Sequence, residues 1–567
     1  MQAFWWGGKI DLENPKIISV YDALKPKLGE NFTLGYERGC DWSATNETAI
    51  IREGDPRTER LNMMLMESSD PTNWKAAIKL ASESDVVIAA LGENPTLCRE
   101  ARQRKGIRLP GDQERFLKEL IATGKPVVLM MFGGRPRVID EVEAGCAAIL
   151  QAWYQVIMGA ETVLSHVDVV EMPNERRQFY KGQAYFFKAL AYFDLIRRWG
   201  DCILQKGGIN WEPVAKTPWP KVCDFAIEMA EKAAEILPPF DKLTDCNGNT
   251  MLSKSTPCQG AAYALLAHLC AWKAGGKYFA AEVDRNYDEK ELWDMAEKAC
   301  TKVIESPLYD LVATPEEVCA SVLVGNSKEG VYETVMKDYY NEVGKRVYSL
   351  GTDYVGYPVR PEYGPGVVQD FTLRIFTTSV RKMYPGADTR KYAYFYDLDG
   401  MDAMDKSITG GFAYPYKERS VNITVTGTKK KFASFNSNRI WWRLADIYLL
   451  RAECRVHLGG DKIEGAIEDL NTIRKRAGAA LYQSSEDNGD LQMTVFRERE
   501  KELLVEGYRY YDIIRNGLDY VHSFLEGGYQ TVTQQDCIDG AFFLMNKSID
   551  FKENPLMRQN LYWLKRQ

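Results

Sequence analysis

The chain has 567 residues, which predicts two or more domains because a domain usually contains roughly 100–200 residues. Hydrophobic residues make up 45% and charged residues 27%, proportions typical of a globular protein with enough apolar material for a core. The net charge of -7, with no run of basic residues, argues against a nucleic-acid-binding surface.

The beginning of the chain carries no recognisable export signal. Residues 1–16 lack the basic and apolar regions of a signal peptide. No stretch of 18 apolar residues occurs, so we expect no membrane-spanning helix.

The first part of the chain, up to about residue 154, has the pattern of an α/β domain. Apolar runs of strand length occur at 85–91, 126–132 and 147–153. Between the first two runs, residues 113–123 place apolar side chains at helical spacing and end at Gly124. Continuous apolar strands separated by a helix predict a parallel sheet that helices cover on both faces.

After about residue 155 the pattern changes to long amphipathic helices. The stretch Phe179–Arg198 is apolar on nearly two faces, so we expect it to be buried between neighbouring helices. Further helical stripes occur at 222–236, 261–272, 292–303, 444–452 and 466–477. Asp461 and Glu464 fit an N-cap and N3 pair that opens the last helix. These helix pairs, with small residues at their crossings, predict a mainly α fold with tetratricopeptide-like stacking behind the N-terminal α/β part.

The helical period fades between about residues 305 and 440. Gly, Pro and Tyr interrupt this region, as in Tyr354–Pro358 and Pro361–Pro365. Long irregular segments on a rigid helical frame are where binding surfaces usually lie. We therefore expect ligand contacts in this region.

Cysteine and histidine give no sign of a metal site. The 12 cysteines form no CxxC pair and no cluster with zinc spacing, and the four histidines are scattered. Cysteines within apolar stretches, such as Cys270, Cys300 and Cys454, are expected to be small core residues. We predict neither a bound metal nor a cofactor.

Residues 3–154 resemble the C-terminal sandwich domain of glycoside hydrolase family 3. The matching blocks, in order, are Gly92–Pro95, Glu100–Gln113, Gly124–Pro136 and Ala152–Tyr154, the last fitting a strand of that domain. The resemblance implies that Glu100 occupies the acid/base position. Retaining glycosidases need two carboxylates about 5–5.5 Å apart, and in this family the nucleophile lies on a separate barrel domain that we do not find here. Ala101 and Gln103 also depart from the family pattern, so we expect Glu100 to be an inactive relic.

From residue 155 to the end, the chain is similar to the SusD/RagB family of glycan-binding outer-membrane lipoproteins. The matching blocks are Gly182–Asp201, Gln259–Ala267, Arg443–Glu453, Ala466–Gly478, Arg499–Asp512 and Asn554–Asn560. The resemblance implies non-catalytic glycan binding for nutrient uptake, a TonB-dependent outer-membrane transporter as partner, and a place on the outer-membrane surface. The lipoprotein signal and lipidated cysteine of the family are not found here, which leaves anchoring open. Within the blocks, Asp446, Arg451 and Glu453 are expected to form ion pairs across helices rather than bind ligand.

Aromatic residues in loops are the candidates for glycan contacts, because a flat ring can stack on the C–H face of a sugar. We predict that Trp211 and Trp219, in a proline-interrupted segment, and Tyr357 and Tyr363, in the irregular middle, bind the ligand.

Two other functions stay open: an exo-acting β-glycosidase, and a fusion of two pieces, 1–154 and 155–567, without a joint function. We also expect the first domain to be the less stable one, since loss of a strand exposes unpaired backbone groups.

Overall fold

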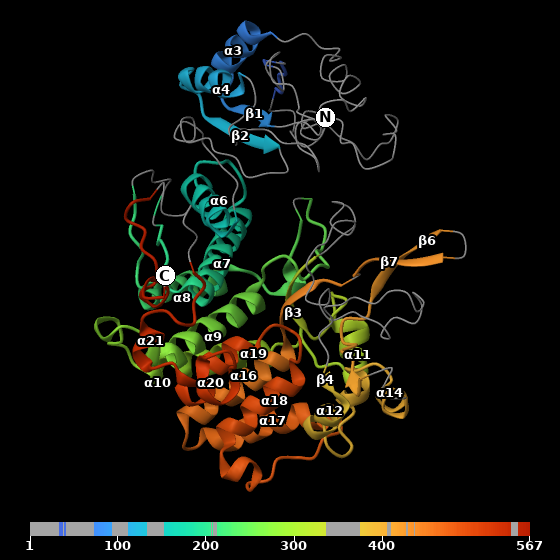
Figure 1. Cartoon of the computed structure of the whole chain (residues 1–567). Coiled ribbons are helices and arrows are strands. Elements are labelled where there is room, and N and C mark those ends of the chain that lie inside the picture. Colours follow the sequence, from blue (N-terminus) through green and yellow to red (C-terminus); the bar gives the residue numbers. More distant parts are fainter. Residues whose placement is uncertain are drawn as a thin grey trace, which may run out of the picture. The chain divides into compact units, whose positions relative to one another are not determined.

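The computed structural model describes residues 33–37, 39–40, 73–92, 112–132, 152–205, 207, 213–245, 247–335, 375–404, 410–426, 429–435, 437–545 and 554–566. The chain divides into two compact units, Met1–Gly159 and Ala160–Gln567 (Figure 1).

In the first unit, strands β1 (Val87–Gly92) and β2 (Val127–Phe132) pair in parallel, with Val87 opposite Val127. Helix α4 (Gln113–Ala122) connects them along the chain, and α3 (Trp74–Glu83) precedes β1. The two predicted strands, their parallel pairing and the predicted helix are confirmed. Among the described residues, the core of this unit contains Ala77, Ala81, Ala89, Leu91, Phe116, Leu117, Leu120 and Val127.

The strand predicted at 147–153, and with it the strand match of 152–154, is wrong where the structure describes it. Residues 147–151 lie outside the described part of the chain, and α6 (Ala152–His166) already begins at 152. Ile157 and Ala160 are buried at helical spacing, and the next residue, Glu161, forms an ion pair with Lys188. These contacts stabilise one face of the helix. Because adding residues to an existing helix is easier than starting one, the helix extends back through residues 152–154.

The second unit is built on long helices that pack in succession. Its first members are α7 (Asn174–Trp199), α8 (Trp219–Ile236), α9 (Gln259–Gly275) and α10 (Glu289–Ile304). The later members are α16 (Leu444–Leu458), α17 (Lys462–Ala477), α18 (Leu491–Glu502), α19 (Arg509–Arg515), α20 (Leu518–Phe524), α21 (Gln534–Ile538) and α22 (Leu561–Leu564). Each of α7 to α10 packs on the next, α16 packs on α10, and α17 and α18 pack on α16 (Figure 1). The predicted helices and the mainly α fold are confirmed.

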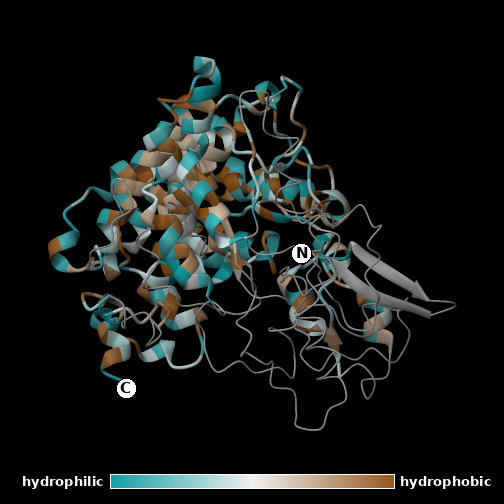
Figure 2. Ribbon diagram, turned by 90° about the horizontal axis from the view of Figure 1, so that it is seen from above, coloured by the Kyte–Doolittle hydropathy of each residue, from teal (hydrophilic) through white to brown (hydrophobic). Residues whose placement is uncertain are grey.

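Small residues let these helices approach closely. Ala261, Ala264, Ala267 and Ala271 of α9 are all fully buried. Along the helices, hydrophobic and hydrophilic stretches alternate, as in amphipathic helices (Figure 2). Burial of one face per helix against its neighbours therefore supplies the core.

The start of α17 differs from the prediction. Asp461 occupies the N-cap position, but its side chain makes no capping hydrogen bond. The amides of Lys462 and Ile463 instead donate to the carbonyls of Gly459 and Gly460, at 3.2 and 3.4 Å. Both glycines have positive φ, which allows this tight turn and removes the need for a side-chain cap.

Between α10 and α16 the chain forms short elements, as the loss of helical period predicts. The helical ones are α11 (Pro315–Glu317), the π-helical turn η4 (Val318–Val322), α12 (Thr377–Met383), α13 (Arg390–Ala393) and α14 (Leu398–Ala403). The strands are β3 (Gly330–Thr334), β4 (Ile375–Phe376), β5 (Phe412–Ala413), β6 (Val421–Thr426), β7 (Lys429–Phe435) and β8 (Arg439–Arg443). Within the described residues they pair antiparallel as β3–β8, β4–β5 and β6–β7.

Ion pairs buried between helices confirm the structural role predicted for the charged family blocks. Asp446 pairs with Arg499 at 2.9 Å, and its other oxygen lies 2.7 Å from His268 Nε2. Arg451 pairs with Asp469 at 2.7 Å. Glu453 similarly accepts hydrogen bonds from Arg515 of α19. These carboxylates and guanidinium groups bind one another and are not available to a ligand.

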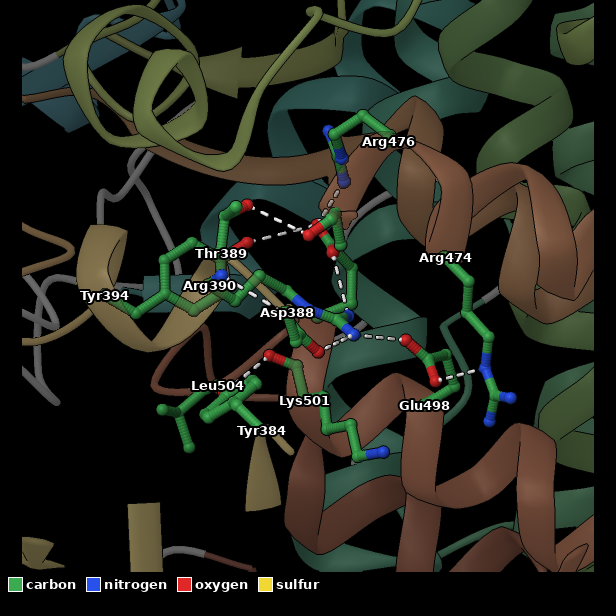
Figure 3. Close-up of polar contacts among 12 residues, drawn as sticks. Tyr384, Asp388, Thr389, Arg390, Tyr394, Arg474, Arg476, Glu498, Lys501 and Leu504 are labelled. Carbon is green, nitrogen blue, oxygen red and sulfur yellow. Dashed lines mark hydrogen bonds and ion pairs between the residues drawn. The ribbon is translucent and has the colours of Figure 1, made fainter. Parts of the chain in front are cut away.

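A second buried charge group joins α17 and α18 to β8 and to the segment around α13. Arg390 lies at its centre and pairs with Asp388 at 2.8 Å and with Glu498 at 2.6 Å (Figure 3). Among the described residues its buried members are Arg390, Arg443, Arg474, Arg476 and Lys417 with Asp388, Glu329, Glu498, Glu502 and Glu506. The partly exposed Glu486 also pairs with Arg474 at the edge of the group. Its opposite charges balance one another, which is the condition for keeping ionised groups in an interior.

Candidate functional site

A stacked pair of aromatic rings, the exposed Phe376 and the partly buried Phe412, lies on the short β4–β5 sheet. Phe376 is directly opposite Phe412 in the antiparallel register, so both side chains lie on the same face of the sheet. The ring centroids are 4.5 Å apart with an interplanar angle of 22°, and 52% of Phe376 is exposed. A Cβ at Gly410 would lie 2.8 Å from the Phe412 ring, so a residue larger than glycine at this position would displace that ring.

Further aromatic residues extend this surface inward. Tyr414 is buried against Met401, and the partly buried Tyr396 and Tyr416 pack against them together with Phe412. The Tyr396 and Tyr416 rings are 5.4 Å apart, edge to face. We call Phe376, Tyr396, Phe412, Tyr414 and Tyr416 the aromatic cluster.

Polar groups lie on the helices that pack against the aromatic cluster. Helices α12 and α14 contact the β4–β5 sheet and each other. Arg381 of α12 bonds to Asp399 at 2.7 Å and to Asp402 at 2.6 Å, both from α14. These two hydrogen bonds raise the pKa of Arg381 above its ordinary value. All three groups are at least partly exposed, so they offer a donor and acceptors beside the rings.

The described part of the sequence-predicted site is not an open surface. Trp219 begins α8 and is only 3% exposed, its ring 4.9 Å from that of Phe279. Its backbone amide donates to Asp201 Oδ1 at 2.9 Å. Protein covers the indole face, so we do not carry Trp219 into the proposed site. The physical reason is that the proline-interrupted segment leads directly into a buried helix start.

The other predicted site residues, Glu100, Trp211, Tyr357 and Tyr363, lie outside the described residues. The segment that contains both tyrosines ends immediately before β4.

Sequence reasoning missed Phe376 and Phe412. The signal for Phe412 was present, since it directly follows the glycine pair 410–411, the kind of loop position searched for aromatics. Phe376 had no such signal, because only strand pairing brings it to Phe412.

The helical unit also contains a cavity of about 420 Å³, formed where ends of α9, α10, α16 and α19 meet. Its wall includes Trp293 of α10 and His457 of α16, whose rings stack with centroids 4.2 Å apart and an interplanar angle of 7°. Charged side chains complete the wall, as described below.

Comparison with protein-family descriptions identifies both parts of the chain. The SusD family matches residues 325–563, and a second family, described as starch-binding associating with outer membrane, matches residues 138–270. Over these residues the helical unit is similar to SusD-family proteins. The glycosyl hydrolase family 3 C-terminal domain matches residues 2–169, which overlap the first unit. Both resemblances drawn from the sequence are confirmed.

Individual relatives divide in the same way. SusD-like protein P38 of Formosa agariphila is 26% identical over 400 residues, covering 64% of this chain and 71% of that protein. A β-xylosidase of the same organism is 29% identical over 149 residues, covering 26% of this chain. This chain spans only 17% of that enzyme's length.

A solved structure shares the SusD fold. The crystal structure of a SusD homolog from Bacteroides thetaiotaomicron superposes with a TM-score of 0.57 at 22% identity, covering 72% of this chain and 82% of that one.

The described residues also bear on membrane insertion and metal binding. None of their helices is both long and apolar enough to cross a membrane. In the same part of the chain, no group of three or more His, Cys, Asp or Glu side chains could hold a metal ion. The described cysteines are all free, and most are buried, as predicted for Cys270, Cys300 and Cys454.

Proposed function

We propose that this SusD-family chain binds an oligo- or polysaccharide without cleaving it. The observation that carries the proposal is the SusD-family match of the helical unit at both its ends, residues 138–270 and 325–563. One of the two matching families is itself described as starch-binding. Binding of a sugar needs flat apolar surface and hydrogen-bonding groups but no proton transfer.

The aromatic cluster is the surface that we propose for this role. The exposed ring of Phe376, stacked on the partly buried Phe412, offers a surface on which the C–H face of a sugar ring can lie. Arg381, Asp399 and Asp402 offer hydrogen bonds to hydroxyl groups beside the rings. Tyr357 and Tyr363 stay in the proposal, because their segment leads directly into β4.

Affinity electrophoresis of the full chain through gels containing different polysaccharides tests this proposal. We expect at least one polysaccharide to retard the parent chain, and Phe376→Ala to weaken the retardation about tenfold, the order of magnitude of a lost stacking contact. Tyr392→Ala is the matched control, since Tyr392 is also 52% exposed but lies beside Lys391 rather than a second aromatic ring. No retardation by any polysaccharide of a broad panel would refute glycan binding, and equal effects of both substitutions would refute the site.

We further propose that the chain acts at the outer-membrane surface with a TonB-dependent transporter in nutrient uptake. Family membership supports this, since one matching family is described as associating with the outer membrane. Co-purification from outer membranes of the source cells tests the partnership. Recovery of the chain without any transporter of this class would count against it.

A second candidate function is exo-acting β-glycosidase activity, which the family 3 match at residues 2–169 favours. The test is release of the chromophore from aryl β-glycosides by the purified chain. Turnover that Glu100→Gln abolishes would establish this function in place of non-catalytic binding. We expect none, because a single matched carboxylate cannot carry out double displacement.

A further inference from the structure

The cavity at the helix ends has a built aromatic wall. Trp293 is almost completely buried, and His457 covers one of its faces. Burial lowers the pKa of His457 below its ordinary value, so the imidazole is neutral at pH 7. Its Nε2 atom is buried and has no hydrogen-bond partner among the described residues. A buried nitrogen of this kind is suited to bond with a polar ligand in the cavity that it lines.

The charges of the wall do not cancel completely. Lys277 lies 3.1 Å from Glu289, and Arg515 is matched by Glu453 at 2.6 Å. Arg285 differs from both of these cations. The only hydrogen bond of its side chain to a described residue runs from Nε to the carbonyl of Ala280, at 3.1 Å.

The two terminal nitrogens of the Arg285 guanidinium are therefore available to donate hydrogen bonds to a ligand. A guanidinium fork matches a carboxylate, to which it donates two parallel hydrogen bonds. The exposed carboxylate of Glu289 can accept hydrogen bonds from hydroxyl groups, and Lys277 can donate to them. The cavity thus combines one site for an anion with several for hydroxyl groups.

We propose that this cavity binds a sugar acid, a monosaccharide-sized polyol that carries a carboxylate. The volume of about 420 Å³ lies within the range of small-molecule sites. In this arrangement the carboxylate bonds to Arg285, while ring hydroxyls bond to Glu289, Lys277 and Nε2 of His457. The site belongs to other elements than the aromatic cluster, and the proposal does not depend on glycan binding there.

Isothermal titration of the full chain with sodium glucuronate, glucose and sodium acetate, at constant ionic strength, tests this proposal. We expect glucuronate to bind at least about tenfold more tightly than glucose or acetate, because only glucuronate provides both the charge and the hydroxyl groups. Titration with a uronate-terminated disaccharide tells whether the site accepts the free sugar acid only or also the end of a chain. Binding of either form supports the proposal.

Two substitutions and two controls locate the binding. Arg285→Gln is expected to weaken glucuronate at least about tenfold, and His457→Phe, which keeps a stacked ring, severalfold. Val283→Ala, at an 85% exposed neighbouring position, and Tyr392→Ala, at a 52% exposed position outside the cavity lining, are expected to leave it unchanged. Equal affinity for glucose and glucuronate, unchanged affinity in Arg285→Gln, or no saturation with any probe would overturn the proposal.

Discussion

Removal of the Glu502 carboxylate probes the buried charge group most directly. The side chain is fully buried and accepts hydrogen bonds from Arg443 at 2.8 Å, Arg476 at 2.5 Å and Arg390 at 3.3 Å. The Tyr394 hydroxyl donates to it as well, at 3.3 Å. Glu502→Gln keeps the shape of the side chain but leaves one uncompensated positive charge in the interior.

We expect Glu502→Gln to lower the free energy of unfolding by about 3–5 kcal/mol, the cost of breaking a buried ion pair on one side. In a unit of about 400 residues the entropy of unfolding is about 0.8 kcal/mol/K, so each kcal/mol corresponds to roughly 1.2 °C in Tm and the expected decrease is roughly 4–6 °C. Thermal unfolding at pH 7, followed by circular dichroism, measures it. Glu500→Gln on the same helix is the matched control, because Glu500 and its partner Arg509 are each 30% exposed, and we expect a loss below about 1 kcal/mol.

The pH dependence provides an independent check of the same reasoning. Burial by itself would raise the pKa of Glu502, but Arg476, Arg443 and Arg390 outweigh it and hold the pKa well below the ordinary value of 4.5. A carboxyl group with a lowered folded-state pKa stabilises the fold above its unfolded pKa, and this contribution is lost as the pH falls. The stability gap between parent and Glu502→Gln should therefore narrow below about pH 4.5. A gap that is constant with pH, or a variant as stable as the parent, would refute the role assigned to this charge.

Three further predictions concern other parts of the chain. Burial lowers the pKa of Lys254 to about 8, so the unfolded chain holds this proton more tightly than the folded chain does. The free energy of unfolding should therefore rise by roughly 2–3 kcal/mol between pH 8 and 10.5. Denaturant titration should find this rise in the parent but not in Lys254→Met. Gly275→Ala should lower the free energy of unfolding by about 1–3 kcal/mol in the same assay, because the added Cβ would lie 2.2 Å from the backbone carbonyl oxygen of Arg515. An unchanged denaturation midpoint would show that the two segments do not approach this closely. Limited proteolysis should cut the first unit before the helical unit, since the described part of its core is much the smaller, and the reverse order of cleavage would contradict this.

The helices of this protein could be placed from sequence because each carries its own apolar period. The stripes at 261–272 and 292–303 correspond to α9 and α10, and both sit on buried faces. Near residue 155 the sequence pattern changes from short apolar runs to long amphipathic helices. This change and the order of the family blocks likewise indicated two pieces of different origin. Local pattern was sufficient because an amphipathic helix needs an apolar face but does not specify its neighbour.

Partners distant in sequence were decided only by tertiary structure. Periodicity showed that Asp446 and Glu453 share a helix, but the fold alone brings Arg499 and Arg515 to them. The same holds for Phe376 and Phe412, which short-strand pairing joins across 36 positions of sequence, and for the cavity built from the ends of separate helices.

Exposure was the property that sequence predicted least well. Trp219 has the flanking prolines of a loop aromatic, yet the packing of Phe279 against its ring makes it part of the core. Residues 152–154 have the composition of a strand, yet they begin a helix. Composition and spacing determined which segments are helical and apolar, whereas the burial of each ring, charge and turn depended on which other segment the folded chain places against it.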